Sequence, residues 1–322
     1  MRVFVTGGNG FIGSVVVRML ASRGHHVRCL LRSTSRTRRL AGLDYETSYG
    51  DVRDPAAVRR GAQGCEAVIH LAGPSSWNDI ASPLMRQVVV DGTRHVLDAA
   101  QESRARTIFV SSVIAINGTE RPVVQDESTA CTLDLRRYPY AAAKIEAEAL
   151  CRAAATRGPA VVIVNPAEVY GPDDDTMVTA GNLRDFARSD PVLVCSGGTS
   201  IVHVEDVAAG ILAALERGRS GERYILGGET LTVRALAEMV LELLGRKARV
   251  LVLPNRMIRA LAAVGRATGL PLPFEPEVIP YATLYWFTDS ARARSELGVE
   301  FRSARETLIP TLAWLRQAGH IP

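Results

Sequence analysis

The stretch VTGGNGFIG, residues 5–13, limits the possible folds of this chain more than any other part of its sequence. It follows a short apolar run, RVFV, and leads into apolar residues at helical spacing. Gly7, Gly10 and Gly13 stand three apart at this junction. Glycine there lets the backbone turn tightly and approach a pyrophosphate, whose charge the N–H groups of a helix start can bind. The stretch predicts a dinucleotide-binding turn, and a simple turn is the alternative.

Short apolar runs alternate with helical patterns through the first half of the chain. They lie at residues 2–5, 26–31, 45–49, 67–72, 107–112 and 160–164. This alternation predicts right-handed βαβ units and therefore an α/β fold, a Rossmann-type doubly wound parallel sheet covered on both faces. We assign residues 1–170 to a dinucleotide-binding domain that the chain rejoins near 201–228. We assign residues 171–322 mainly to a smaller substrate-binding domain, with the apolar segment 251–281 as a lid.

Charge, apolar runs and cysteine spacing exclude several classes of function. A net charge of +4 over 322 residues is too small to indicate a nucleic-acid or membrane partner. No apolar run reaches membrane-spanning length, and glycines interrupt the first run too early for a signal peptide. The five cysteines are scattered and lack metal-ligand spacing, which indicates buried thiols in a reducing compartment and no metal site. We expect a cytoplasmic protein that acts on a small molecule.

The segment YPYAAAK places Tyr140 and Lys144 four residues apart, on one face of a helix that Pro139 would open. An ammonium beside a phenol favours the phenolate, so we expect a lowered tyrosine pKa and proton exchange with a substrate oxygen. Tyr138 is not a candidate, because Ala142 stands four residues beyond it. A pair at this spacing also occurs by chance in many helices.

Together these motifs resemble the extended branch of the short-chain dehydrogenase/reductase superfamily, which carries T-G-G-x-G-F-I-G. The resemblance covers nearly the whole chain. Further matching motifs are GDV (50–52), HLAG (70–73), IFVSSV (108–113), NPAEVYGP (165–172) and VHVEDVAAG (202–210). Within the branch, the chain is most similar to dihydroflavonol reductase-like and hopanoid-associated epimerase-like proteins.

The resemblance implies a role for each matching residue. Tyr140 would supply a proton, Lys144 would tune Tyr140 and hold the cofactor ribose, and Ser112, with Ser111 as second choice, would orient a carbonyl. Asp51 would accept a hydrogen bond from the adenine amine. The implied cofactor contacts are Gly7, Gly10, Phe11, Ile12, Gly13, Asp51, Val52, Leu71, Ala72, Gly73, Tyr140, Lys144, Asn165, Pro166 and Val169. Members often form homodimers through helices that correspond here to residues 83–103 and 138–156.

The stretch VRCLLRSTSRTRR, residues 27–39, contains five arginines and indicates the cofactor. NAD-preferring members of the superfamily carry an acidic residue at the end of the second strand, where this chain has Leu31. Arg32 matches the arginine that similar reductases use for the 2′-phosphate of NADP, and Ser33 and Arg36 would assist it. The resemblance therefore favours NADP (NADPH). A solvated basic face or a nucleic-acid patch is the alternative.

Two positions depart from the family pattern. Val89 stands where many members have asparagine, which puts any water relay through that asparagine in question. Thr199 and Ser200 stand where nucleotide-sugar enzymes often have an arginine that contacts the diphosphate. Three lid arginines could still reach a phosphate: Arg256, Arg259 and Arg266.

We therefore expect an NADP(H)-dependent oxidoreductase that acts on a carbonyl or secondary alcohol of a largely apolar small molecule. A nucleotide-sugar epimerase, dehydratase or 4-ketoreductase is the alternative enzyme, and a dinucleotide-sensing regulator without turnover is the alternative from another class. We interpret His203 and Asp206 as loop-bracing residues and His70 as a core histidine. For Trp77 two interpretations stay open: it lines the substrate pocket, or it packs under the lid.

Overall fold

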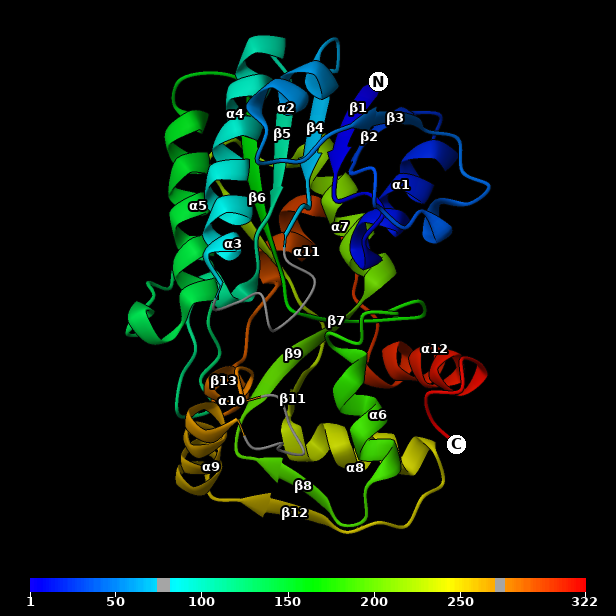
Figure 1. The fold of residues 1–322 in the computed structure, drawn as a ribbon, viewed down its shortest axis with the longest axis vertical. Helices are drawn as coiled ribbons and strands as arrows, with labels where there is room; N and C mark the ends of the chain where they lie inside the picture. Colours follow the sequence, from blue (N-terminus) through cyan, green and yellow to red (C-terminus); the bar gives the residue numbers. More distant parts are fainter. Residues whose placement is uncertain (74–81, 270–275) are drawn as a thin grey trace.

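The computed structural model describes residues 1–73, 82–269 and 276–322. Trp77 and residues 270–275 of the expected lid lie outside these ranges. Within them, seven parallel strands form one sheet in the order β10-β6-β5-β4-β1-β2-β3 (Figure 1). The strands are β1 (Arg2–Thr6), β2 (His26–Leu31), β3 (Glu46–Tyr49), β4 (Ala67–His70), β5 (Arg106–Val110), β6 (Val161–Pro166) and β10 (Arg223–Leu226). Strand order runs outward on both sides of β1, so the expected Rossmann-type α/β fold is confirmed.

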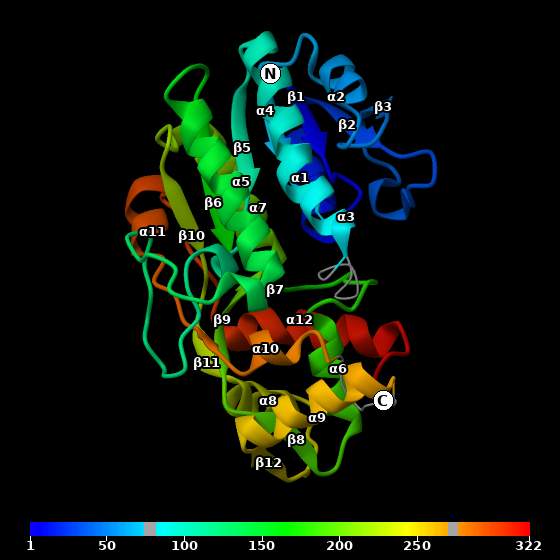
Figure 2. The same cartoon turned by 60° about the vertical axis from the view of Figure 1, so that its left-hand side comes forward.

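Helices cover both faces of this sheet (Figures 1 and 2). One face carries α1 (Phe11–Ser22) and α7 (Val204–Arg217), with α11 (Ala291–Leu297) beside α7. The other carries α2 (Pro55–Ala62), α4 (Gly92–Ser103) and α5 (Pro139–Ala155), and α3 (Pro83–Arg86) leads into α4. Strand β1 contacts both layers because its side chains alternate: Val3 and Val5 join the core cluster that includes α1, and Phe4 joins the one that includes α2 and α4.

A second region lies beyond the carboxyl ends of these strands, in the lower half of Figure 1. Its strand β9 (Gly198–His203) pairs with β7 (Glu168–Tyr170), β11 (Thr230–Thr232) and β13 (Tyr285–Trp286), and β8 (Val192–Cys195) pairs with β12 (Val250–Leu253). Its helices are α6 (Ala180–Arg188), α8 (Val233–Leu243), α9 (Asn255–Thr268), α10 (Ile279–Ala282) and α12 (Ala304–Gln317). Tyr170, Leu183 and Ile201 are buried in a core of its own.

The chain rejoins the main sheet through α7 and β10. The run at 201–204, which we expected to begin the return to the sheet, does not do so: Ile201 and Val202 belong to β9 and pair with β7. One flank of β6 is occupied by β5, so a single edge position remained beside it, and Arg223–Leu226 fills that position.

All five cysteines are free thiols; Cys131 is half-buried and the other four are buried. Among the described residues, no helix is both long enough and apolar enough to span a bilayer.

Candidate functional site

The carboxyl ends of β1, β4, β5 and β6 meet at one edge of the sheet. Thr6 pairs with His70, His70 pairs with Phe109, and Val110 pairs with Val164. Because the strands are parallel, the residues that follow them emerge at this edge, facing the second region (Figure 1). In open α/β sheets, ligands bind at such an edge.

The glycine motif forms a cradle at this edge. Gly7 has a φ of +72°, and a Cβ placed on it would lie 2.8 Å from the backbone nitrogen of Ala72. A Cβ on Gly13 would lie 2.1 Å from the carbonyl oxygen of Gly7. Gly10 is the N-cap of α1 and brings no capping side chain, so Phe11 and Ile12 begin a helix whose first N–H groups can bind an anion. These residues fit the pyrophosphate of a dinucleotide.

The residues after β4 are held against β1. The N–H groups of Leu71 and Ala72 donate to the carbonyl and hydroxyl oxygens of Thr6, at 3.0 and 3.3 Å, and Gly73 follows them. His70 is buried, with its ring nitrogens 2.6 Å from Thr6 Oγ1 and 3.1 Å from Thr93 Oγ1. Burial lowers the His70 pKa to about 3. Its interpretation as a core histidine is confirmed.

Asp51 and Val52 follow β3. Arg53 donates to both carboxylate oxygens of Asp51, with Nε and a terminal nitrogen each at 2.9 Å. This contact lowers the pKa of Asp51 and keeps the group charged. The backbone N–H of Arg53 also donates to Oδ1, at 2.9 Å, so Oδ2 is the oxygen that retains a lone pair for a further donor. Val52 is buried against Gly92.

The five arginines between residues 27 and 39 divide into three groups: Arg32 and Arg36, Arg38 and Arg39, and Arg28 alone. Leu31 is buried, and Arg32, Ser33 and Arg36 after it are exposed. Arg38 and Arg39 instead hold the loop after β7: Arg38 lies 2.5 Å from an Asp175 oxygen, and Arg39 donates to the Asp173 carbonyl at 2.6 Å. Arg39 also donates to the carbonyl of Asn9, at 3.5 Å, and so ties this loop to the glycine turn.

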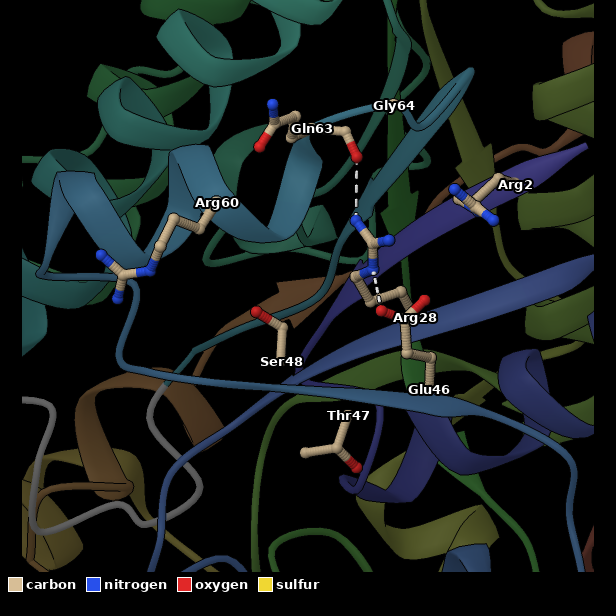
Figure 3. A pocket seen from close by; sticks show the side chains of 8 residues that line it. All are labelled: Arg2, Arg28, Glu46, Thr47, Ser48, Arg60, Gln63 and Gly64. Carbon is tan, nitrogen blue, oxygen red and sulfur yellow. Dashed lines mark hydrogen bonds and ion pairs between the residues drawn. The ribbon is translucent and has the colours of Figure 1, made fainter.

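Arg28 points to the opposite edge of the sheet. It lines a hollow of about 440 Å³ beside the first residues of β1 and β3 (Figure 3). There it pairs with Glu46 at 2.9 Å and donates to the carbonyls of Gly61 and Gln63. The other residues that line the hollow are Arg2, Thr47, Ser48, Arg60 and Gly64. This hollow is separate from the candidate site, because it lies at the amino ends of the strands.

The catalytic candidates lie together at the edge of the sheet that also holds the glycine cradle: Ser112, Tyr140 and Lys144. Tyr140 is the second residue of α5, and its phenol shares a hydrogen bond with the Ser112 side chain. Lys144 is buried one turn later; its Nζ donates to the Val110 carbonyl at 2.9 Å and lies 5.9 Å from the centre of the Tyr140 ring. Ser111 turns away and donates to Glu148 at 2.7 Å.

The expected lowering of the Tyr140 pKa is wrong for this structure. Burial raises this pKa to about 12, and the hydrogen bond with Ser112 opposes the rise. Lys144 does not offset it, because its ammonium binds the Val110 carbonyl instead of the phenol. Burial lowers the Lys144 pKa to about 8, and the charge of Glu148 opposes that change. Near neutral pH the phenol therefore keeps its proton while most of the lysine is charged.

Glu148 is a functional candidate that the sequence analysis missed. Its side chain is 1% exposed. One carboxylate oxygen accepts from Ser111 and Asn165, both at 2.7 Å, and the other accepts from Arg152 at 2.7 Å and Arg223 at 3.3 Å. A buried carboxylate is tolerated only when charged and polar partners surround it in this way.

Asn165 connects this carboxylate to the catalytic candidates. Its Nδ2 also donates to the Ser112 carbonyl, at 2.9 Å. The signal for Glu148 was present in the sequence: Tyr140, Lys144 and Glu148 follow one another at four-residue intervals, hence on one helix face. Spacing alone does not distinguish this residue from the many glutamates that are solvated on helix surfaces.

In the second region, Thr199 lies beside a carboxyl group. The Glu168 side chain accepts from Tyr170 at 2.6 Å and Asn182 at 3.1 Å, and it also hydrogen-bonds Thr199. Burial raises the pKa of Glu168. Ser200 is fully buried, and its hydroxyl accepts from the Thr288 N–H at 3.0 Å.

Two of the lid arginines bind within the second region. Arg259 donates to Thr283 Oγ1, and Arg266 donates to the Pro276 carbonyl, both at 2.9 Å. Arg256 is exposed on α9.

Three other predicted positions lie in the core. Pro166 ends β6 beside Leu226, and the Val169 side chain is buried, which leaves its backbone as the part that could face a cofactor. Val89 is buried in the helical turn Gln87–Asp91, and its carbonyl accepts from Thr93 at 2.5 Å.

His203 and Asp206 brace the start of α7. The His203 ring accepts from the Glu205 N–H at 3.2 Å, and Asp206 accepts from the Arg302 N–H at 2.9 Å. The Arg302 side chain also contacts His203. The interpretation of both as bracing residues is confirmed.

Comparison with known proteins finds a family model that covers more than half of the chain and relatives that cover nearly all of it. A family model described as "NAD dependent epimerase/dehydratase family" matches residues 3–227. The chain is 32% identical to a Synechocystis sp. protein named for dihydroflavonol 4-reductase, over 99% of this chain and 95% of that protein. It is 33% identical to a 4-hydroxy-2-methyl-3-oxo-4-farnesyl-3,4-dihydroquinoline-1-oxide ketoreductase from Stigmatella aurantiaca, over 99% and 97% of the two chains. The solved structure of a dTDP-glucose 4,6-dehydratase from Streptomyces venezuelae, with NAD and TYD bound, matches with a TM-score of 0.79 and 26% identity over 98% and 97%.

Proposed function

The chain belongs to the NAD dependent epimerase/dehydratase family, of the extended short-chain dehydrogenase/reductase type, and from this membership and the site geometry we propose that it is an NADP(H)-dependent reductase. Its relatives include reductases and dehydratases, and members use a nicotinamide cofactor. The proposed reaction interconverts a carbonyl and a secondary alcohol on a largely apolar small molecule.

The observation that carries this proposal is the grouping of Ser112, Tyr140 and Lys144 at the sheet edge that also holds the glycine cradle. The bound cofactor would supply hydride from nicotinamide C4 to the carbonyl carbon. Tyr140 is protonated near neutral pH and would donate its proton to the carbonyl oxygen, which Ser112 would orient. The Lys144 ammonium binds the Val110 carbonyl and lies 5.9 Å from the centre of the Tyr140 ring, so its charge would act on the phenolate from a distance, after Tyr140 has given up its proton and until solvent returns it.

Preference for NADP is supported by the end of β2. Leu31 is buried and carries no charge that would repel a 2′-phosphate. Arg32 and Arg36 are exposed beside it, and a guanidinium can bind phosphate through two hydrogen bonds. We assign the glycine motif to the pyrophosphate, Asp51 and Val52 to the adenine, and residues 71–73, Asn165, Pro166 and Val169 to the nicotinamide half.

An apolar substrate is supported by the second region. A diphosphate needs arginines or helix N-termini, whereas Thr199 stands beside the carboxyl group of Glu168. Arg259 and Arg266 are engaged by Thr283 and Pro276. The name of the Stigmatella relative describes a ketone on a farnesylated quinoline, which is a largely apolar compound.

We further propose a homodimer formed through α4 and α5. These helices lie side by side on an outer face of the nucleotide-binding half (Figure 2). Packing of this pair against its copy in a second chain would give a four-helix contact.

The test combines two measurements. We expect NADPH oxidation with members of a panel of aromatic and alicyclic ketones, and a melting temperature that millimolar UDP or dTDP leaves unchanged. A marked shift with either nucleotide and no turnover of any ketone would favour the sugar-nucleotide epimerase or dehydratase instead. Binding of NADPH without turnover of any substrate would favour a dinucleotide-sensing regulator.

A further inference from the structure

The helix that carries Tyr140 and Lys144 needs a cap from elsewhere. Tyr138 occupies its N-cap position, with φ −131° and ψ 67°, and its side chain makes no capping hydrogen bond among the described residues. Pro139 follows and has no N–H. The first donors without a partner inside the helix are therefore the N–H groups of Tyr140 and Ala141, the positions that an N-cap side chain normally satisfies.

The phenol oxygen of Tyr281 fills this role. It accepts a hydrogen bond from the Tyr140 N–H at 3.2 Å and another from the Ala141 N–H. Tyr281 lies on α10, 141 residues further along the chain than Tyr140, and its side chain is buried. Two donors that would otherwise be left in a poorly solvated place are thus satisfied by the second region.

Aromatic contacts hold the Tyr281 ring in position. It meets the Tyr138 ring edge-on, with 5.3 Å between ring centres, and it stacks on Trp286 at 6.2 Å. The indole N–H of Trp286 donates to the Tyr281 carbonyl at 2.9 Å. The oxygen can therefore be withdrawn from α5 only if this whole group moves.

The segment around Tyr281 is joined to the rest of the second region. Ile279, two residues before Tyr281, belongs to an apolar cluster with Cys195 of β8 and Ile258 of α9. The carbonyl of Ala282 accepts a hydrogen bond from the Cys195 thiol at 3.1 Å. A shift of β8 or α9 would therefore be passed to the Tyr281 oxygen.

We propose that Tyr281 is a positioning residue for Tyr140, through which the placement of the second region controls the orientation of the proton donor. The inference rests on the proposed role of Tyr140. Tyr140 is in the first turn of α5, so fraying of that turn would separate its phenol from Ser112. The cap would keep this turn helical whenever the second region is in place.

Tyr281→Phe tests the proposal, because it keeps the ring contacts and removes only the oxygen. Loss of an N-cap costs about 1 kcal/mol, so we expect kcat to fall roughly five- to tenfold. The KM of the ketone and the Kd of NADPH should stay within about twofold of wild type, because the cap touches neither ligand. Amide hydrogen exchange at Tyr140 and Ala141 should become faster, while exchange in α4 should not change.

Tyr285→Phe is the matched control, since it removes a phenol oxygen from the same segment, and it should behave as wild type. Full kcat in folded Tyr281→Phe, or unchanged exchange at residues 140 and 141, would overturn the proposal. The proposal would also be overturned if Tyr281→Phe lowered kcat, NADPH affinity and melting temperature together, because that pattern indicates general destabilisation. Full activity in Tyr140→Phe would instead contradict the proposed function. The exchange data would still decide whether Tyr281 caps α5.

Discussion

The nucleotide-binding half and the second region build their polar sites in different ways. In the first, the candidate groups lie within short sequence motifs, most of which follow the ends of adjacent parallel strands: Gly7 after β1, Leu71 after β4, Ser112 after β5. Tyr140 and Lys144 lie one turn apart on α5. In the second, the polar groups also depend on contacts between different elements, as Glu168 of β7 contacts Asn182 of α6 and Thr199 of β9. A parallel sheet brings motifs together by its topology, whereas the second region depends on packing.

This contrast predicts which substitutions should have large effects on activity and which should have small ones. Changes at the sheet edge should affect the chemical step or cofactor binding strongly, because groups there would touch the reacting atoms. Changes that act through packing or charge should have smaller effects, visible as shifts in orientation or pH dependence.

The largest effect is expected at Tyr140. Tyr140→Phe should lower kcat by roughly a hundred- to ten-thousandfold, the usual contribution of a positioned general acid, and should leave the Kd of NADPH unchanged. Lys144→Ala should lower both turnover and NADPH affinity. Tyr138→Phe is the control, because Tyr138 packs against Tyr281 and has no lysine at the matching position. Steady-state kinetics and NADPH titration measure these effects, and a greater loss in Tyr138→Phe than in Tyr140→Phe would show that the assigned register is wrong.

An intermediate effect is expected at Arg32. Arg32→Ala should weaken NADPH binding by roughly ten- to a hundredfold, the equivalent of one charge-assisted hydrogen bond to phosphate, and should leave NADH binding nearly unchanged. Arg60→Ala removes an arginine from the opposite edge of the sheet and should change neither. Calorimetric titration of both cofactors into the three proteins is the measurement. Equal losses for NADPH and NADH would contradict the assignment of Arg32 to the 2′-phosphate.

The smallest effect on turnover is expected at Glu148, whose charge acts through Lys144. The carboxylate raises the Lys144 pKa against the effect of burial, which lowers it to about 8. In Glu148→Gln this support is lost, so Lys144 releases its proton at lower pH. The alkaline limb of the kcat profile should therefore move down, by roughly one pH unit.

Glu146→Gln is the control for this shift, because Glu146 is on the same helix but pairs with Arg86 at the surface. Its pH profile should match that of wild type. Glu148→Gln should also melt at a lower temperature, because Arg223 loses the charge of its buried partner. An alkaline limb that moves upward or stays in place would contradict the electrostatic role of Glu148.

Much of the nucleotide-binding half could be predicted because its signals are local. Alternation of apolar runs and helical patterns is visible over windows of about ten residues, and it led to the strands and to the parallel sheet. The Tyr140–Lys144 spacing is a property of one helix. The error at residues 201–204 has the same origin: an apolar run indicates a strand, but only competition for the edge beside β6 decides which sheet that strand joins.

Other features could not be found in this way, since they depend on contacts between segments far apart in the chain. The run of arginines at 27–39 indicated a phosphate site, but nothing local showed that Arg38 and Arg39 would instead hold Asp175 and Asp173. The expected lowering of the Tyr140 pKa followed from spacing, and burial by the folded chain reversed it. Residue order alone determined the glycine turn, the sheet and the helix that presents Tyr140, because backbone conformation and side-chain periodicity are set within a few residues. Only the tertiary structure decided the partners of Glu148 and the cap from Tyr281, because a hydrogen bond between distant segments exists once packing has excluded water and fixed both groups within about 3 Å.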